Sequence, residues 1–336
     1  MSPSMDVTVL MDAAAIPEDD PELTGKPSET LTEGHVSRAL RELGHRVRVV
    51  GVADEVNSIM KAFEEHRPEL VFNLTEQFAD NRQLDTNVAG LMEMMKIRFT
   101  GTGSTGLLLC RDKGLCKELL GFHRVRVPRF VRVARGKAMK LPRRLPFPMI
   151  VKPTMEDGSD GISLESVVKN EEELAKRAGF VHERWQQEAI AEEYVEGREL
   201  YVGVLGNERL TVLPARGIDF GELVGQRPLV ATSKVKHDAE YRQKWKIRYG
   251  AAELTGPEFG RVARVCKRIY RLLRMKDFGR IDLRMTSAGE IMFLEANPNP
   301  DMGRNEEVAE AAESAGIKYT ALVDRIVRLA MKRYES

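Results

Sequence analysis

The sequence predicts a multidomain α/β protein, with a small parallel α/β domain first and a larger region of mixed strands and helices after it. Its 336 residues allow roughly two domains of about 150 residues, or three small ones. Over the first hundred residues, short apolar strands alternate with helices, which is typical of a parallel sheet. Hairpins and Pro-containing segments then replace that alternation, so the second region is expected to be organised differently.

In the first domain, apolar runs predict four short strands, at 6–11, 47–52, 70–74 and 97–100. Helices are expected to connect them, at 29–43, 54–66 and 83–95. Gly44 and Pro68 follow the first two helices, where such residues end a helix. A strand, helix, strand order of this kind favours parallel pairing of the strands.

In the second region, helical spacing of apolar residues predicts helices at 104–120, 170–187, 257–275, 305–315 and 319–334. Strands are expected at 149–152, 189–193, 200–205, 280–285 and 290–295. The last two flank the turn sequence TSAG and therefore predict a hairpin. Residues 209–250 are expected to alternate short strands with loops.

The composition excludes several classes of function. Lys and Arg total 52 and Asp and Glu total 51, so no overall field attracts nucleic acid or an anionic membrane. The three cysteines form neither a disulfide framework nor a zinc pattern, which indicates a reducing compartment. No apolar run reaches the ~18 residues of a membrane span, and the N-terminus lacks a signal-peptide pattern. We expect a cytoplasmic protein that binds neither nucleic acid nor membrane.

Residues 101–106, GTGSTG, fit the glycine pattern of dinucleotide-binding loops. The motif lies after several other elements, and no strand ending in an acidic residue follows ~20 residues later, where a ribose ligand is required. We therefore interpret it as a tight turn that begins a helix.

The predicted hairpin carries Arg280, Asp282, Glu295 and Asn297. Because side chains alternate along a strand, Arg280 and Asp282 share one face, and Glu295 and Asn297 share a face of the other strand. Two carboxylates and an amide oxygen suit Mg²⁺, and the arginine adds a fixed charge for phosphate. The alternative is a surface hairpin held by a salt bridge.

Two further segments are candidates for nucleotide binding. Lys152 ends an apolar strand, and the glycine-rich loop DGSDG that follows allows backbone N–H groups to approach a phosphate. In IAEEYVEGREL, backbone groups of residues 193–195 face a possible base edge and Glu199 a sugar. The alternatives are a flexible hairpin loop and an ordinary strand pair. Lys113 and Lys234, taken singly, are typical solvated surface lysines.

Nine segments occur in one order: VFNL, RFTGTGS, CRDK, FPMIVKP, DGSDG, EEYVEGRE, SKVK, FGRIDL and FLEANPNP. From about residue 70 to the C-terminus this order resembles the ATP-grasp superfamily, and within it the D-alanine–D-alanine ligase family. The resemblance implies an N-terminal α/β domain before an ATP-grasp fold of two α+β lobes, with ATP between the lobes. The implied domains are residues 1–106, a central lobe 107–198 and a C-terminal lobe 199–336.

The resemblance also implies roles for individual residues. Lys113 and Lys152 would contact ATP, Gly158, Ser159 and Gly161 would form the loop over its phosphates, Glu192, Glu193, Tyr194 and Val195 would read adenine, and Glu199 would hold ribose. Lys234 would meet the γ-phosphate and Arg280 the transferred phosphate; with Lys152 these are the expected catalytic residues. Asp282, Glu295 and Asn297 would bind Mg²⁺ or Mn²⁺. A homodimer is implied by the resemblance alone.

The implied reaction joins a small carboxylate to a small amine through an acylphosphate. Departures from the family pattern affect the substrate positions: Asp301 stands where a glycine is expected, and Glu306 stands near an expected serine that holds a carboxylate. An acid there repels a carboxylate and attracts a cation. We expect a product other than D-alanyl-D-alanine, made from a cationic amine or from an amino acid whose carboxylate is held elsewhere. The alternatives are a solvated helix start formed by Asp301, Glu306 and Glu307, an ATP-grasp kinase, and a non-catalytic nucleotide-binding module.

Overall fold

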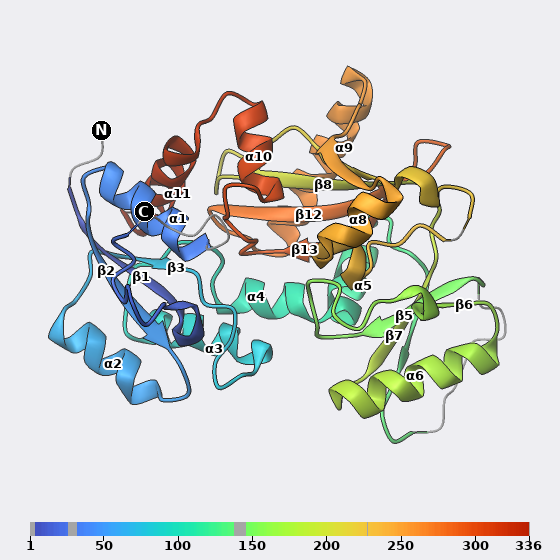
Figure 1. The fold of residues 1–336 in the computed structure, drawn as a ribbon, viewed down its shortest axis with the longest axis horizontal. Coiled ribbons are helices and arrows are strands. Elements are labelled where there is room, and N and C mark those ends of the chain that lie inside the picture. The colour runs from blue at the N-terminus through green and yellow to red at the C-terminus, as the bar shows by residue number, and fades with distance from the viewer. Residues whose placement is uncertain (1–3, 26–31, 138–145, 227, 336) are drawn as a thin grey trace.

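The computed structural model describes residues 4–25, 32–137, 146–226 and 228–335, and it contains three separate sheets (Figure 1). The first is a parallel sheet of β1 (Asp6–Asp12), β2 (Arg46–Val52) and β3 (Leu70–Asn73), in the order β2-β1-β3. Its connecting helices are α1 (Thr32–Glu42), α2 (Val56–Glu65) and α3 (Asp85–Met94). The predicted parallel α/β arrangement of this region is therefore present.

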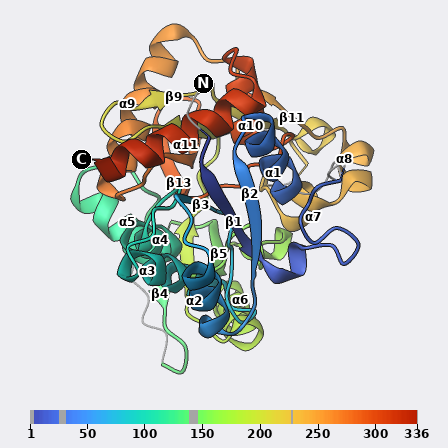
Figure 2. The same cartoon turned by 90° about the vertical axis from the view of Figure 1, so that its left-hand side faces the viewer.

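Alternate residues of β1 enter two different cores. Val7, Val9 and Met11 pack with α1, whereas Leu10 packs with α2 and α3 on the other face. The first core also includes α10 (Glu307–Ser314) and α11 (Tyr319–Glu335), so the C-terminal helices complete the N-terminal sheet. Figure 2 shows α11 beside α1 along this sheet. The two ends of the chain thus share one hydrophobic core.

The second sheet is small and antiparallel, in the order β4-β7-β5-β6. Its strands are β4 (Phe130–Val133), β5 (Met149–Pro153), β6 (Val167–Val168) and β7 (Ala189–Glu193). Helix α6 (Glu171–Trp185) packs on one face through Leu174, Ala178 and Val181. The opposite face of this small sheet is turned toward the third sheet.

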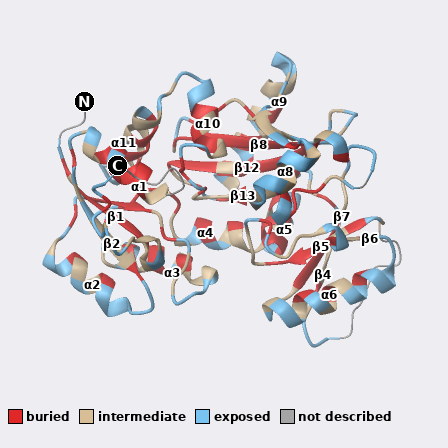
Figure 3. Cartoon of the chain, in the orientation of Figure 1, coloured by how far each residue is buried: buried red, intermediate tan, exposed pale blue. Residues whose placement is uncertain are grey.

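The third sheet is antiparallel, in the order β11-β10-β8-β12-β13, with β9 paired to β8. Its strands are β8 (Arg198–Leu205), β9 (Thr211–Val212), β10 (Arg216–Asp219), β11 (Arg248–Ala251), β12 (Phe278–Met285) and β13 (Ile291–Asn297). Helices α5 (Lys113–Phe122) and α9 (Gly256–Leu272) cover one face. Figure 3 shows β8 and β12 buried along most of their length.

Three expectations need correction. Residues 97–100 form no strand, only an isolated bridge between Val71 and Phe99. The helix expected over 104–120 is two helices, α4 (Ser104–Arg111) and α5, because Asp112 leaves helical geometry and its side chain caps α5. Residues 209–250 include two helices, α7 (Ser233–His237) and α8 (Ala239–Trp245), as well as strands. Of the helix expected over 29–43, residues 29–31 lie outside the described residues, and α1 covers Thr32–Glu42.

The glycine motif at 101–106 is a tight turn that begins a helix, as interpreted from the sequence. Gly101 has a φ of +86°, and Gly103 is the N-cap of α4. The backbone N–H of Thr102 donates to Oδ1 of Asn299 at 2.8 Å, so the turn supports the loop that follows β13. In the described part of the chain, no helix is long and apolar enough to span a membrane.

Candidate active site

Strand alternation builds a polar wall on one face of the third sheet. On β8, Leu200, Val202 and Val204 enter the core under α5 and α9, so Glu199 and Tyr201 face the opposite side. On β12, Ile281, Leu283 and Met285 enter the same core. The charged side chains of β12, which are Arg280, Asp282 and Arg284, therefore share the polar face. This is the face turned toward the small sheet.

A β-bulge brings β13 into the same wall. Asp282 pairs with Glu295, but Leu283 pairs with Phe293, so Leu294 is the extra residue. The bulge lets Phe293 enter the core while Glu295 and Asn297 lie opposite Asp282 and Arg280. Without it, Phe293 and Glu295 would lie on one face.

The four predicted hairpin residues form one cluster. Both Nε and Nη2 of Arg280 donate to the Asp282 carboxylate, at 2.8 and 3.1 Å. Asn297 Nδ2 donates to Asp282 Oδ2 at 3.1 Å. Burial raises the pKa of Asp282 above its ordinary value, although Arg280 opposes the effect. The structure thus brings together the predicted phosphate-binding arginine and the predicted metal ligands.

Three lysines lie between the two sheets. Lys113 Nζ is 2.9 Å from Glu295 Oε1, and Lys152 Nζ is 3.1 Å from Glu192 Oε2. Lys117, fully buried, lies 3.1 Å from Glu192 Oε1 and donates to the Leu294 carbonyl oxygen at 2.6 Å. Lys117 therefore joins the small sheet to the bulge of the large one, a role that the sequence did not indicate.

These ion pairs fix the charges of the carboxylates. Burial would raise the pKa of Glu295, but Lys113, Lys152 and Lys236 lower it to about 2. Burial likewise opposes ionisation of Glu192, and the neighbouring Lys117 and Lys152 outweigh it and lower its pKa. Lys152 has a lowered pKa, chiefly because it is buried. The carboxylates of Glu295 and Glu192 are therefore ionised near neutral pH.

Two cavities flank this wall. One of about 750 Å³ is lined by the phosphate-loop residue Gly158, by Lys113, Arg280 and Glu295, and by the loop that follows β13. The other, of about 80 Å³, lies between the sheets and is lined by Lys152, Glu199 and Asp282. All four residues predicted to read adenine, Glu192 to Val195, line the smaller cavity.

The predicted hinge and phosphate loop face each other across the smaller cavity. The N–H groups of Glu193 and Tyr194 donate to the carbonyl oxygens of Arg129 and Pro148, at 2.7 and 3.0 Å. Ser159, with a φ of +66°, donates from Oγ to the Ala231 carbonyl oxygen at 2.7 Å. The N–H groups of Glu193 and Tyr194 therefore already have partners, and of the backbone groups of residues 193–195 that were expected to pair with a base edge, these two are not free to donate.

Glycines shape the predicted phosphate loop. Gly158 and Gly161 have φ values of +61° and +74°, a backbone region that favours glycine. A Cβ on Gly161 would lie 2.6 Å from Pro153, so the loop folds tightly against the end of β5.

The structure does not place Lys234 at the site. Lys234 is exposed on α7 and lines neither of the two cavities just described, whereas Lys236, two residues later, lines both. Lys236 also acts electrostatically on Asp282, Glu295 and Glu307 and lowers the pKa of both glutamates. The motif SKVK contains both lysines. Because α7 is helical, only the second of them, Lys236, lines the cavities.

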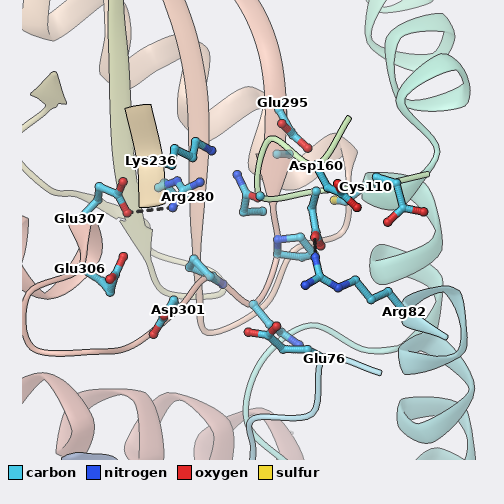
Figure 4. Close-up of a pocket in the computed structure, with 18 of the residues that line it drawn as sticks. Glu76, Arg82, Cys110, Asp160, Lys236, Arg280, Glu295, Asp301, Glu306 and Glu307 are labelled. Atoms are coloured by element: carbon cyan, nitrogen blue, oxygen red, sulfur yellow. Dashed lines mark hydrogen bonds and ion pairs between the residues drawn. The ribbon is translucent and has the colours of Figure 1, made fainter. Parts of the chain in front are cut away.

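Acidic residues line one wall of the larger cavity (Figure 4). Glu307 Oε2 is 2.9 Å from Arg280 Nη1, the dashed line in Figure 4, so Arg280 is shared between Asp282 and Glu307. Glu306 is the N-cap residue of α10 but makes no side-chain capping bond. Burial, Asp301 and Glu307 raise its pKa to about 7. Asp301 accepts from Gly303 N at 2.8 Å and from Thr32 Oγ1. The predicted substrate residues therefore lie at the cavity, with Glu307 added.

Comparisons with known proteins agree with this geometry. The family model described as D-ala D-ala ligase C-terminus matches residues 113–328. The uncharacterized protein y4sG of Sinorhizobium fredii is 28% identical over 329 residues, 92% of this chain and 91% of that protein. A D-alanine–D-alanine ligase of Syntrophobacter fumaroxidans is 30% identical over 253 residues, 74% of this chain and 76% of that protein.

A solved structure has the same fold. The D-alanine–D-alanine ligase from Bacillus anthracis, complexed with ATP, superposes with a TM-score of 0.76 at 19% identity, over 99% of this chain and 100% of that one. The expected ATP-grasp fold is therefore present, and the domain limits at residues 106 and 198 stay predictions. Because the family model covers more than half of its length and a D-alanine–D-alanine ligase is 30% identical over 74% of it, the chain belongs to the D-alanine–D-alanine ligase family.

Proposed function

We propose that the protein joins a small carboxylate to a cationic amine, using ATP and an acylphosphate, and that D-alanyl-D-alanine is not its product. The protein is an ATP-dependent ligase of the D-alanine–D-alanine ligase type. The charges that line the larger cavity support this choice of substrates.

The pairing of Arg280 with Glu307 carries the proposal. Arg280 has its guanidinium engaged by Asp282 on one side and by Glu307 on the other. A substrate carboxylate that approached Arg280 would have to displace Glu307, at the cost of a charge-assisted hydrogen bond. With Glu306 and Asp301 beside it, this wall favours an ammonium group over a carboxylate. We therefore infer an amine substrate that brings a positive charge and no carboxylate to Arg280.

The nucleotide is assigned to the smaller cavity and the adjoining part of the larger one. Lys152 and Lys236 face it with positive charge, and Glu199 lies at the end away from Arg280. A cavity of 80 Å³ is smaller than the ~300 Å³ of a typical ligand pocket, so ATP requires the small sheet to move outward. Lobe movement of this kind is common around nucleotides.

Magnesium fits the donor set at the hairpin. Among the residues that the structure describes, no three His, Cys, Asp or Glu side chains are arranged to hold a metal by themselves. Asp282, Glu295 and Asn297 offer two carboxylates and an amide, a set that Mg²⁺ completes with phosphate oxygens and water. When bound there, the ion would neutralise charge on the phosphates. Glu295, with its pKa of about 2, stays ionised for this role.

The chain's own residues supply the remaining chemistry. A substrate carboxylate oxygen attacks the γ-phosphorus of ATP and ADP leaves; Lys236 stabilises the charge on the transferring phosphoryl group, and Arg280 does so where that more highly charged group takes the place of Glu307. The amine nitrogen then attacks the acyl carbon and phosphate leaves. Glu306 is proposed to take the proton that the amine loses, since a pKa of about 7 suits a general base.

A substrate screen tests the proposal. The purified protein is incubated with Mg-ATP, with pools of small carboxylates, and with either diamines and polyamines or D-alanine as amines. We expect ADP release with a basic amine, and a product whose mass equals the two substrates less one water. D-alanyl-D-alanine formation from D-alanine alone would overturn the substrate pair. A phosphorylated product without ligation would favour a kinase, and ATP binding without turnover would favour a nucleotide-binding module.

A further inference from the structure

Arg284 is a buried cation in the smaller cavity that the sequence did not single out. It lies on β12 directly opposite Glu199 of β8, on the polar face that also carries Asp282. Its Nη2 is 2.6 Å from Glu199 Oε2, and only 6% of its side chain and 9% of that of Glu199 are exposed. At such burial each charge requires its partner.

The two oxygens of Glu199 are held from different sides. Arg284 occupies Oε2, and the hydroxyl of Tyr201 donates to Oε1 at 2.9 Å. A carboxylate has about four lone-pair sites, so Glu199 retains one acceptor position on each oxygen. Because both existing donors are fixed on neighbouring strands, the direction of the two remaining positions is fixed as well.

Arg284 also contacts Leu229, which directly precedes Val230 and Ala231 in the lining of the cavity. Its Nη1 donates to the Leu229 carbonyl oxygen at 3.2 Å. The N–H of Leu229 in turn donates to the hydroxyl of Tyr194, in the predicted hinge, at 2.7 Å. One guanidinium thus connects the Glu199 carboxylate to the backbone at Leu229 and, through it, to Tyr194 on the cavity wall.

We propose that Arg284 is a positioning residue for the nucleotide sugar: it holds Glu199 so that the carboxylate accepts from both ribose hydroxyls. Discrimination between ribose and deoxyribose nucleotides then depends on Arg284, which itself does not touch the reacting atoms. The inference rests on the proposed function, which places ATP in this cavity. It adds a specificity determinant outside the predicted site residues.

The test is nucleotide binding by the full chain without carboxylate or amine. Titration calorimetry with ATP and with 2′-deoxy-ATP compares the wild type with Arg284→Met and Arg284→Lys. The wild type is expected to favour ATP by about tenfold, the worth of one charge-assisted hydrogen bond. Arg284→Met is expected to bring that ratio below about twofold, because Glu199 loses its orientation, and Arg284→Lys to restore part of it.

A matched control separates positioning from a general loss of a charge pair. Arg132 on β4 is partly buried, lies 2.6 Å from Glu188, and lines neither cavity. Arg132→Met should keep the wild-type nucleotide ratio. In steady state, where ADP release is measurable, Arg284→Met should raise the KM for ATP more than it lowers kcat. Circular dichroism confirms that each variant is folded, and the lysine variant carries the test if the methionine variant is not.

Three results would overturn the inference. They are a wild type that does not distinguish the two nucleotides, an Arg284→Met protein that keeps the preference, and an equal loss of both nucleotides in that variant. The proposed function fails separately. If the preference depends on Arg284 but no carboxylate–amine pair is ligated, the inference stands and the substrate proposal falls.

Discussion

Replacing Glu306 by Gln should stabilise the folded protein at alkaline pH and change it little at acid pH. Burial and the nearby Asp301 and Glu307 raise the pKa of Glu306 from 4.5 to about 7, against the opposing effect of Arg280. The folded protein therefore binds this proton more tightly than the unfolded chain does. The stability that this tighter proton binding contributes is fully present below pH 4.5 and is lost as the pH rises through 7. Glutamine cannot ionise, so the variant does not lose this stability at high pH.

The size of the effect follows from the two pKa values. At about 1.4 kcal/mol for each pH unit, the interval from 4.5 to about 7 is worth at most about 3.4 kcal/mol. Because the Glu306 side chain is only partly buried, solvent screens its neighbours, and we expect about 1–2 kcal/mol. Most of this gain should develop between pH 4.5 and about pH 7.

Urea unfolding of the wild type and of Glu306→Gln, followed by circular dichroism at pH 5 and pH 8, measures the difference. The matched control is Glu313→Gln, an exposed glutamate on the same helix, which should show no pH-dependent gain. An equal change at both pH values, or the same change in the control, would refute the account of this cavity wall. A lower stability of Glu306→Gln at pH 8 would do the same.

Three other changes test the site. Glu307→Ala removes the acceptor on one side of Arg280, so D-alanine-dependent ADP release should rise about tenfold, the worth of one charge-assisted hydrogen bond; an unchanged rate contradicts the argument from Arg280. Lys236→Met should lower kcat for ADP release about a hundredfold, as expected for a preorganised charge at the phosphoryl group. The exposed Lys234→Met should stay within about threefold of the wild type, and a reversed order would restore the original assignment. Lys117→Met leaves Glu192 with Lys152 as its remaining ion-pair partner and should cost about 3 kcal/mol in urea unfolding, against no measurable loss for the surface control Lys61→Met.

The polar wall was largely predictable because it depends on local alternation. Arg280 and Asp282 share a face in the sequence pattern and in the structure. The bulge at Leu294 was not predictable, since it depends on how β13 pairs with β12 and not on β13 alone. Lys117 was missed for the same reason, because its two partners come from β7 and β13, far from it in sequence.

Long-range packing explains the main gap in the predicted architecture. Helices α10 and α11 close the core under β1 and α1, a contact between residues about three hundred positions apart. The apolar faces of these helices were visible in the sequence, but no local pattern says which sheet they cover. As a result α10 brings Glu306 and Glu307 to the cavity while its other side anchors the N-terminal sheet. The position of the acidic residues at the larger cavity therefore depends on the packing of α10 against the N-terminal sheet.

The two lysines of SKVK show how a wrong secondary-structure expectation leads to the wrong choice of a candidate site residue. In a strand, residues two apart point to the same face, so Lys234 and Lys236 would be equivalent. In a helix of 3.6 residues per turn they point about 200° apart, and only one can face a cavity. Segment 233–237 is helical, with Val235 buried, and Lys236 takes the cavity side while Lys234 is exposed. The position of the predicted γ-phosphate lysine therefore depends on the geometry of one short helix, which the motif alone does not determine.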